Sequence, residues 1–182
     1  MSHPTTLAVL ELFRRRGNSQ YGREAVTQLE HALQAAMFAE RDGADASLIT
    51  AALLHDVGHL LHALPNDAPE QGIDDHHETA AAIWLNKRFG PDVVEPVRLH
   101  VAAKRYLCTV EPEYREVLSG PSLVSLELQG GLLSDGEREE FESSVSCAAA
   151  VLLRRWDDAA KVVGLATPPL EHFAQYVDGC AR

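Results

Sequence analysis

Residues 53–59 read LLHDVGH. This stretch is the most informative part of the sequence, because it places three ionisable side chains in an apolar segment rich in Ala and Leu. A polar group in such a segment costs free energy unless another group satisfies it. The pattern predicts a helix, in which His55 and His59 share a face and Asp56 points about 100° away. His55 and Asp56 can then approach one metal ion, with His59 beside it. The alternative is a set of capped or solvent-facing polar residues, which chance favours for an isolated His-Asp pair.

Helical periodicity continues on both sides of this stretch. The third predicted helix, residues 48–61, contains the motif and has Asp45 or Ser47 as its cap. The other predicted helices lie over residues 7–16, 26–42 and 77–88, over a segment with Pro96 in its first turn, over residues 134–161 behind a Ser134–Glu137 capping box, and after Thr167-Pro168-Pro169.

Two segments do not show this periodicity. Residues 63–75 hold two prolines and a glycine and are predicted to form a loop or lid. Residues 121–131 fit either a strand or a short helix. The chain has no internal repeat and no linker long enough to separate domains, so we expect one all-α domain over residues 1–182.

Composition excludes several classes of protein. The 27 acidic and 16 basic side chains give a formal net charge of −11, which argues against a nucleic-acid partner. No apolar run approaches the ~20 residues of a membrane helix. Cys108, Cys147 and Cys180 form no CxxC pair, and a reducing, cytoplasmic compartment is the simplest expectation.

The nine histidines are the feature that composition leaves unexplained. Histidine and carboxylate side chains together suit iron, manganese or zinc, and the ligand types alone do not separate these metals. A carboxylate can also bridge two metals through its two oxygens. The residues that could join His55 and Asp56 around metal are predicted on other helices: His31, His77, His100 and Asp157.

These residues carry a resemblance. His31, His55-Asp56 and Asp157 match the H…HD…D pattern of the HD-domain superfamily, an all-helical fold best known for metal-dependent phosphohydrolases. The additional pair His77 and His100 is typical of its dinuclear members. The chain most resembles the small HD-domain mixed-valence diiron oxygenases that cleave the carbon–phosphorus bond of organophosphonates. The matching segments span most of the chain and include those around Lys104 and residues 129–131.

The resemblance implies a dinuclear site in the helix core, with dioxygen as co-substrate and Fe(II)/Fe(III) as the metal pair. Asp56 would bridge the two irons. His31, His55 and Asp157 would complete the ligands of one iron, and His77 and His100 those of the other. His76 is an alternative to His77, because a shift of one residue would exchange them.

The resemblance also implies a small organophosphonate substrate. Its phosphonate would be bound by His59, Lys104, Ser122 and Gln129, and Asp56, His59 and Lys104 would act in catalysis. Lys104 shares a helical face with His100, although a solvated surface lysine is the alternative. Tyr21 and Glu24 match residues near the amino end of the substrate; the alternative is a loop tyrosine and an exposed glutamate.

The implied reaction cleaves a 2-amino- or 2-trimethylammonio-1-hydroxyethylphosphonate with dioxygen into glycine or glycine betaine plus phosphate. The residues leave the choice between the two substrates open, and they leave the oligomeric state open. One alternative is an HD phosphohydrolase acting on a nucleotide or phosphate monoester, which would have no use for His77 and His100. Another is a non-catalytic HD module. His3, His62 and His172 are interpreted as surface or structural residues.

Overall fold

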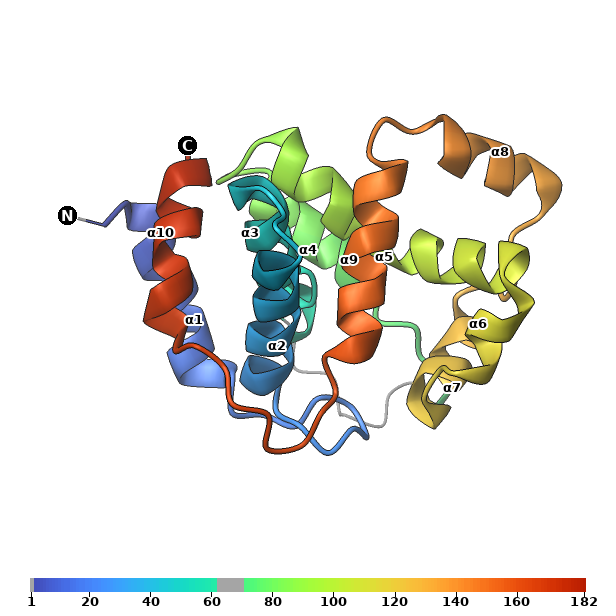
Figure 1. Ribbon diagram of the computed structural model, residues 1–182, viewed down its shortest axis with the longest axis horizontal. Coiled ribbons are helices and arrows are strands. Elements are labelled where there is room, and N and C mark those ends of the chain that lie inside the picture. The colour runs from blue at the N-terminus through green and yellow to red at the C-terminus, as the bar shows by residue number, and fades with distance from the viewer. Residues whose placement is uncertain (1, 62–70) are drawn as a thin grey trace.

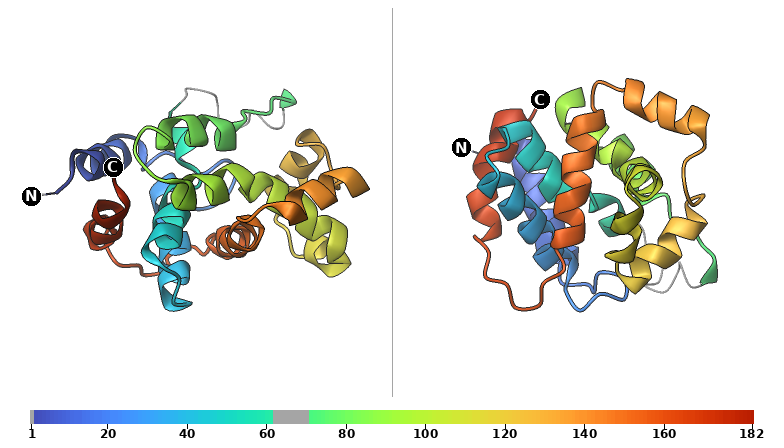
Figure 2. Two further views of the ribbon diagram at one scale, coloured as in Figure 1. Left: turned by 90° about the horizontal axis from the view of Figure 1, so that it is seen from above. Right: turned by 45° about the vertical axis from the view of Figure 1, so that its right-hand side comes forward.

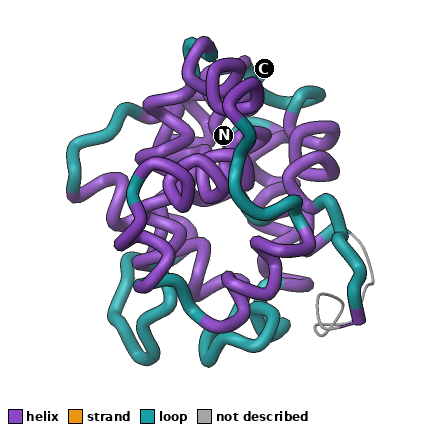
Figure 3. Tube along the Cα trace, turned by 90° about the vertical axis from the view of Figure 1, so that its right-hand side faces the viewer, coloured by secondary structure: helices purple, strands orange, loops and turns teal. Residues whose placement is uncertain are grey.

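Helices form the architecture of residues 2–61 and 71–182, which this computed structural model describes. No strand occurs among these residues (Figure 3), so the all-α prediction is confirmed. The elements are α1 (Pro4–Arg16), α2 (Gln28–Arg41), α3 (Ala46–Leu54), the 3₁₀ helix η1 (Val57–Leu60), α4 (His77–Leu85), α5 (Pro91–Val110), α6 (Pro112–Glu116), α7 (Gly120–Leu128), α8 (Asp135–Ser143), α9 (Cys147–Ala159) and α10 (Leu170–Cys180).

Helix α3 lies at the centre of the packing, in contact with α2, α5, α9 and α10. Helices α1 and α10 pack together at one end of the molecule, and α6, α7 and α8 lie at the other (Figures 1 and 2). Helix α5 crosses between these ends and packs on both α4 and α9. Every described helix is too short or too polar to cross a membrane.

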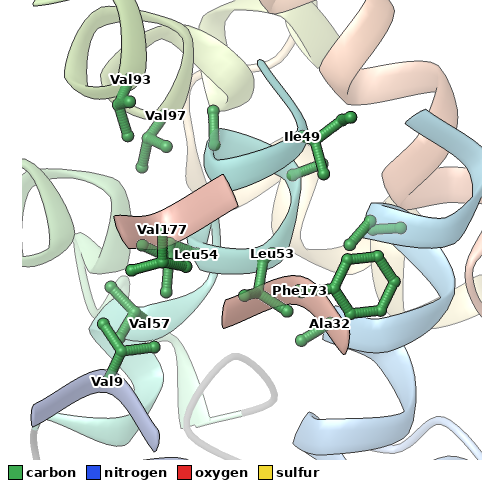
Figure 4. Close-up of a cluster of buried hydrophobic side chains, with 14 of the residues drawn as sticks. Val9, Ala32, Ile49, Leu53, Leu54, Val57, Val93, Val97, Phe173 and Val177 are labelled. Atoms are coloured by element: carbon green, nitrogen blue, oxygen red, sulfur yellow. The ribbon is translucent and has the colours of Figure 1, made fainter. Parts of the chain in front are cut away.

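The main apolar core surrounds α3 (Figure 4). Leu53 and Leu54 are at most 2% exposed and pack in one cluster with Ala32 of α2 and Phe173 and Val177 of α10. Full burial of each leucine contributes about 1.5–3 kcal/mol. This packing fixes the end of α3, and therefore the place where the His55-Asp56 motif begins.

The prediction of one helix over residues 48–61 is wrong at the motif itself. Helix α3 ends at Leu54, His55 is its C-cap, and Asp56 has φ −101° and ψ 13° before η1 begins. At Gly58 the chain passes so close to α4 that an added Cβ would lie 2.0 Å from the carbonyl oxygen of His77. With this break in the helix, Asp56 Oδ2 lies 3.4 Å from His55 Nε2.

The prediction of one helix over residues 134–161 is also wrong. The capping box forms as expected, because the backbone N–H of Ser134 donates to Glu137 over 2.8 Å. The chain then leaves the helix at Ser144, which is extended, and restarts as α9 at Cys147. The Ser144 hydroxyl accepts a hydrogen bond from the backbone N–H of Ser146, and such local bonds compete with the helical ladder.

Smaller differences concern proline and the uncertain segments. Helix α5 begins at Pro91, so Pro96 lies inside the helix and not in its first turn. Residues 121–131, left open between strand and helix, form most of α7 and the turn after it. Asp45 caps α3, and α10 begins after Pro169, both as predicted. Of the expected loop, residues 72–75 are non-helical and Gln71 is assigned to a 3₁₀ turn; His62 and residues 63–70 lie outside the described residues.

Candidate metal centre and its cavity

Six buried side chains from five helices converge on one point beside the end of α3. As whole residues they are at most 7% exposed, and each was singled out as a possible metal ligand from the sequence. They come from α2, the end of α3, the first turn of α4, the middle of α5 and α9: His31, His55, Asp56, His77, His100 and Asp157.

One half of this cluster groups around a single oxygen of Asp56. The Nε2 atoms of His31 and His55 are 3.0 Å apart, and each is 3.4 Å from Asp56 Oδ2. Asp157 Oδ1 approaches the same two nitrogens at 3.4 Å from His31 and 3.9 Å from His55. These four residues offer two imidazole nitrogens and two carboxylate oxygens to one ion.

The other half groups around the second oxygen of the same carboxylate. His77 Nε2 and His100 Nε2 are 3.1 Å apart, and each is 3.4 Å from Asp56 Oδ1. Asp56 therefore lies between two histidine pairs and turns one oxygen to each. This arrangement suits a carboxylate that bridges two ions.

The opposite ring nitrogen of each histidine is already engaged. The Nδ1 atoms of His31, His55 and His100 lie 2.7–2.8 Å from the backbone carbonyls of Ala160, Ala52 and Val97. His77 Nδ1 lies 2.9 Å from Asp75 Oδ1. Since a carbonyl or carboxylate only accepts, each Nδ1 carries the proton and each Nε2 turns a lone pair toward the cluster.

Nitrogen lone pairs that face one another must share a positive ion, which can be a proton or a metal ion. Both oxygens of Asp56 and Oδ1 of Asp157 are buried and have no hydrogen-bond partner among the described residues. Ligand atoms about 2.1 Å from one ion, at tetrahedral or octahedral angles, are about 3.0–3.4 Å apart. The spacing of the donors in both halves matches this value. The residues present therefore fit two metal ions.

Electrostatics support the same reading. Burial lowers the pKa of His31, but the carboxylates of Asp157 and Asp56 outweigh it and raise the pKa to about 9 in the absence of metal. The negative charge that favours a second proton on His31 would equally favour a metal ion in the place of that proton. Burial raises the pKa of Asp157, but the Arg154 guanidinium outweighs it and holds the pKa well below its usual value. Both carboxylates are thus ionised at neutral pH and attract positive charge into the cluster.

Arg154 is a part of the site that sequence reasoning did not assign. Its Nη1 lies 2.7 Å from Asp157 Oδ2, which leaves Oδ1 turned toward the histidines. Arg154 is itself buried and held by Asp158 and by Tyr114. The only available signal was its position three residues before Asp157, on the same face of α9.

A cavity of about 510 Å³ lies over the cluster. The residues predicted to bind substrate all line it: Tyr21, Glu24, His59, Lys104, Ser122 and Gln129. Asp56, His77, His100 and Asp157 also line the cavity, so its contents can reach both halves of the cluster.

Two lysines and a row of serines form one wall of the cavity. Lys104 is 2% exposed and donates to Ser125 Oγ over 2.8 Å. Lys161 donates to Ser122 Oγ over 3.1 Å. Lys161 and Ser125 were not predicted, although Lys161 follows Asp157 by four residues, as Lys104 follows His100. This wall presents hydroxyl and ammonium donors, which suit an oxyanion.

Tyr21 and Glu24 line the cavity beside this wall. The Tyr21 ring stacks on the His31 ring, with centroids 3.9 Å apart and 12° between the planes. Burial and the charges of Asp56 and Asp157 raise the pKa of its hydroxyl well above the usual value, so Tyr21 is a neutral phenol. Glu24 accepts a hydrogen bond of 2.6 Å from the Ser119 hydroxyl.

His76 and His77 have separate environments. His77 lies in the cluster, whereas the His76 side chain is 69% exposed and lies beside Asp74. His59 lines the cavity and contacts Asp75, a residue that sequence reasoning did not single out.

The cavity concentrates positive charge in an acidic protein. Six of the chain's sixteen basic side chains line it: Arg15, Arg16, Arg23, Lys104, Arg154 and Lys161. An anion can therefore be bound locally even though the net charge is −11.

Known proteins resemble this chain in sequence. A family model described as HD domain matches residues 28–125. The chain is 49% identical to the hydroxymethylphosphonate dioxygenase of Gimesia maris, over 95% of this chain and 86% of that protein. It is 41% identical to the glycine-betaine-forming [1-hydroxy-2-(trimethylamino)ethyl]phosphonate dioxygenase of Leisingera caerulea, over 91% and 85%. An uncharacterised protein of Acanthamoeba polyphaga mimivirus is 38% identical over 91% and 76%.

The family model covers more than half of the chain, and both named dioxygenases match it over most of their length. The resemblance predicted from the H…HD…D pattern is thereby confirmed, as is the expectation of an oxygenase. The chain belongs to the HD-domain family, and within it to the phosphonate dioxygenases.

Proposed function

We propose that this chain uses dioxygen and two iron ions to cleave the carbon–phosphorus bond of a small 1-hydroxyphosphonate. The observation that carries the proposal is the position of Asp56, between two histidine pairs and beneath a cavity with a cationic wall. His31, His55 and Asp157 would hold one iron, His77 and His100 the other, and Asp56 both. The bound irons supply the redox chemistry that activates dioxygen.

The chemistry of the bond explains why an oxidation is needed. Hydrolysis of a phosphate ester expels an alkoxide, whereas hydrolysis of a phosphonate would expel a carbanion. Oxidation of the hydroxyl-bearing carbon removes this obstacle. The reaction balances as R–CH(OH)–PO₃²⁻ plus O₂ giving R–COOH plus HPO₄²⁻.

The protein's own contribution is to bind and orient the substrate and to exclude water. Lys104, Ser122, His59 and Gln129 are proposed to bind the phosphonate oxygens. Lys104 follows His100 by one helical turn and supplies positive charge there. Gln129 also lines the cavity and would donate through its side-chain NH₂ group. Tyr21 covers His31 and is proposed to act as a plug that moves aside when substrate binds.

The substituent on C2 is proposed to be a primary amine or a trimethylammonium group, with Glu24 as its partner. Support comes from the carboxylate of Glu24 in the cavity lining and from the name of the relative in Leisingera caerulea. The name of the relative in Gimesia maris points instead to a substrate without C2. Such a substrate would make no use of Glu24.

One experiment tests both the oxygen-dependent cleavage and the assignment of the C2 substituent. The iron-loaded enzyme is given hydroxymethylphosphonate and the 2-amino and 2-trimethylammonio compounds, and oxygen consumption and phosphate release are measured together. We expect oxygen-dependent phosphate release, and Glu24→Gln should lower kcat/KM for an ammonium substrate about tenfold or more. Preference for hydroxymethylphosphonate, unaffected by Glu24→Gln, would overturn the C2 assignment. Oxygen-independent phosphate release from nucleotides would instead favour the phosphohydrolase.

The titration of Lys104 predicts a pH dependence of substrate binding. Burial, with a contribution from Arg154, lowers the pKa of Lys104 to about 7. Because only the charged ammonium attracts the phosphonate, affinity should fall as pH rises through that value. Above pH 7 we expect KM to rise by up to about tenfold per pH unit, since a phosphate-like group with a second pKa of about 6 is already dianionic there.

Lys104→Arg is the matched variant for this prediction. A guanidinium stays charged across the range, so the KM of this variant should be nearly independent of pH between 7 and 9. A wild-type KM that is flat over this range, or an equal slope in the arginine variant, would contradict the role of Lys104.

A further inference from the structure

A stacked pair of histidines joins the cavity to the metal cluster. The ring of His59, which lines the cavity, lies on the ring of His77, with centroids 4.1 Å apart and 20° between the planes. His59 is 24% exposed and His77 only 9%. The outer ring is therefore the one that meets the contents of the cavity, and the inner ring is the one that faces Asp56.

One carboxylate holds both rings. Asp75 Oδ1 lies 2.9 Å from Nδ1 of His77, and Asp75 Oδ2 lies 2.7 Å from Nδ1 of His59. Oδ1 also accepts the backbone N–H of His77 at 3.2 Å, so the carboxylate is fixed to the first turn of α4. Each oxygen thus serves a different histidine.

We propose that Asp75 is a positioning residue that couples the phosphonate-binding His59 to the metal-binding His77. The proposal rests on the function given above, because that function assigns the two histidines to substrate and metal. By accepting a hydrogen bond from each Nδ1–H, Asp75 fixes which nitrogen of each ring carries the hydrogen and how each ring is oriented. For His77 this leaves the Nε2 lone pair directed at the metal.

The backbone around Asp75 supports a specific role. The next residue, His76, has φ 46° and ψ 40°, the only positive φ outside glycine among residues 2–61 and 71–182. Its side chain is exposed, and the neighbouring Asp74 contacts this exposed ring. A left-handed histidine costs free energy, and such positions cluster at functional sites. This turn places Asp74 beside the exposed His76 and Asp75 beside the buried His77.

The test is a double-mutant cycle on the metal-loaded protein. Asp75→Asn keeps the size of the side chain but can accept from only one ring at a time. Its affinity for the second metal ion, measured by competition with a chelator, should fall about 10–100-fold. Its affinity for inorganic phosphate, measured by calorimetry, should fall about tenfold. Asp74→Asn is the matched control for metal affinity and should leave it unchanged. Because Asp74 also lines the cavity, Asp135→Asn on α8, whose side chain is 96% exposed and outside the cavity lining, is the control for phosphate affinity and should leave it unchanged.

The cycle separates coupling from a merely structural role. His59→Ala should weaken phosphate binding and leave metal affinity unchanged. When Asp75→Asn is added to His59→Ala, phosphate affinity should fall no further, because the ring that Asp75 positions is already gone. Additive losses of phosphate affinity, or an unchanged second-metal affinity in Asp75→Asn, would overturn the proposal.

Two further readouts keep the outcome clear. If Asp75→Asn does not fold, Asp75→Glu retains both acceptor oxygens, and we expect it to restore part of the metal and phosphate affinity. Failure of this restoration counts against the proposal. Both affinities are measured without turnover. An enzyme that binds two metals and phosphate but cleaves no phosphonate would therefore refute the proposed function and leave the role of Asp75 to be decided by the cycle.

Discussion

Asp56→Asn is expected to lose at least one of the two metal ions and to lower the rate of phosphonate cleavage about a thousandfold or more. The two oxygens of Asp56 each lie 3.4 Å from two Nε2 atoms, one pair in each half of the cluster. An amide offers one oxygen only. Its NH₂ group would donate to the histidine lone pairs that must face metal, and so would fill one half of the site with hydrogen bonds.

The same substitution should also lower the stability of the metal-free fold. In the absence of metal, burial raises the pKa of Asp56, but His55, His100 and His31 outweigh it and hold the pKa well below its usual value. A neutral amide loses this attraction, so the melting temperature of the metal-free variant should be lower than that of the wild type at neutral pH. Metal content, turnover and thermal unfolding are measured on Asp56→Asn beside Asp74→Asn. A metal-replete, active Asp56→Asn would contradict the bridging role.

His100→Ala is expected to lower the rate of oxygen-dependent cleavage about a hundredfold or more. One metal ion should be retained. The group of His31, His55, Asp56 and Asp157 is untouched by this change. The other half keeps only His77 and Asp56 Oδ1. A reaction that requires two ions should therefore fail, whereas a hydrolase that needs only the H…HD…D set should continue.

The control for this variant is His76→Asn, which removes an exposed imidazole while tolerating the left-handed backbone at this position. It should keep both metal ions and full activity. Metal content and oxygen consumption are measured for both variants. A His100→Ala enzyme that still consumes oxygen with a phosphonate would refute the dinuclear requirement.

Much of the helical architecture could be predicted from the sequence, because apolar periodicity and capping residues are local signals. Asp45 and Ser134 cap the helices that follow them, as expected. The break at Asp56 was not predictable in this way. It depends on the close approach of Gly58 to the carbonyl of His77, a contact between residues far apart in the sequence.

The candidate site likewise contains residues that could be predicted from the sequence and residues that are recognised only from their contacts in the fold. Its six cluster residues could be predicted because their spacing matches a family pattern. Arg154, Lys161 and Asp75 could not, because a basic or acidic residue near a helix end is ordinarily a solvated one. Only folding shows that Arg154 is buried against Asp157, and that one carboxylate at residue 75 meets two histidines. Such supporting residues are defined by their neighbours in space.

Metal analysis combined with low-temperature electron paramagnetic resonance tests the central claim most directly. The purified, partly reduced protein should contain about two irons per chain and give a coupled mixed-valence signal that shifts when a 1-hydroxyphosphonate is added. The two histidine pairs around one carboxylate are the structural basis of this expectation. Zinc or a single metal ion in the active protein, with phosphate released from nucleotides in the absence of oxygen, would contradict it.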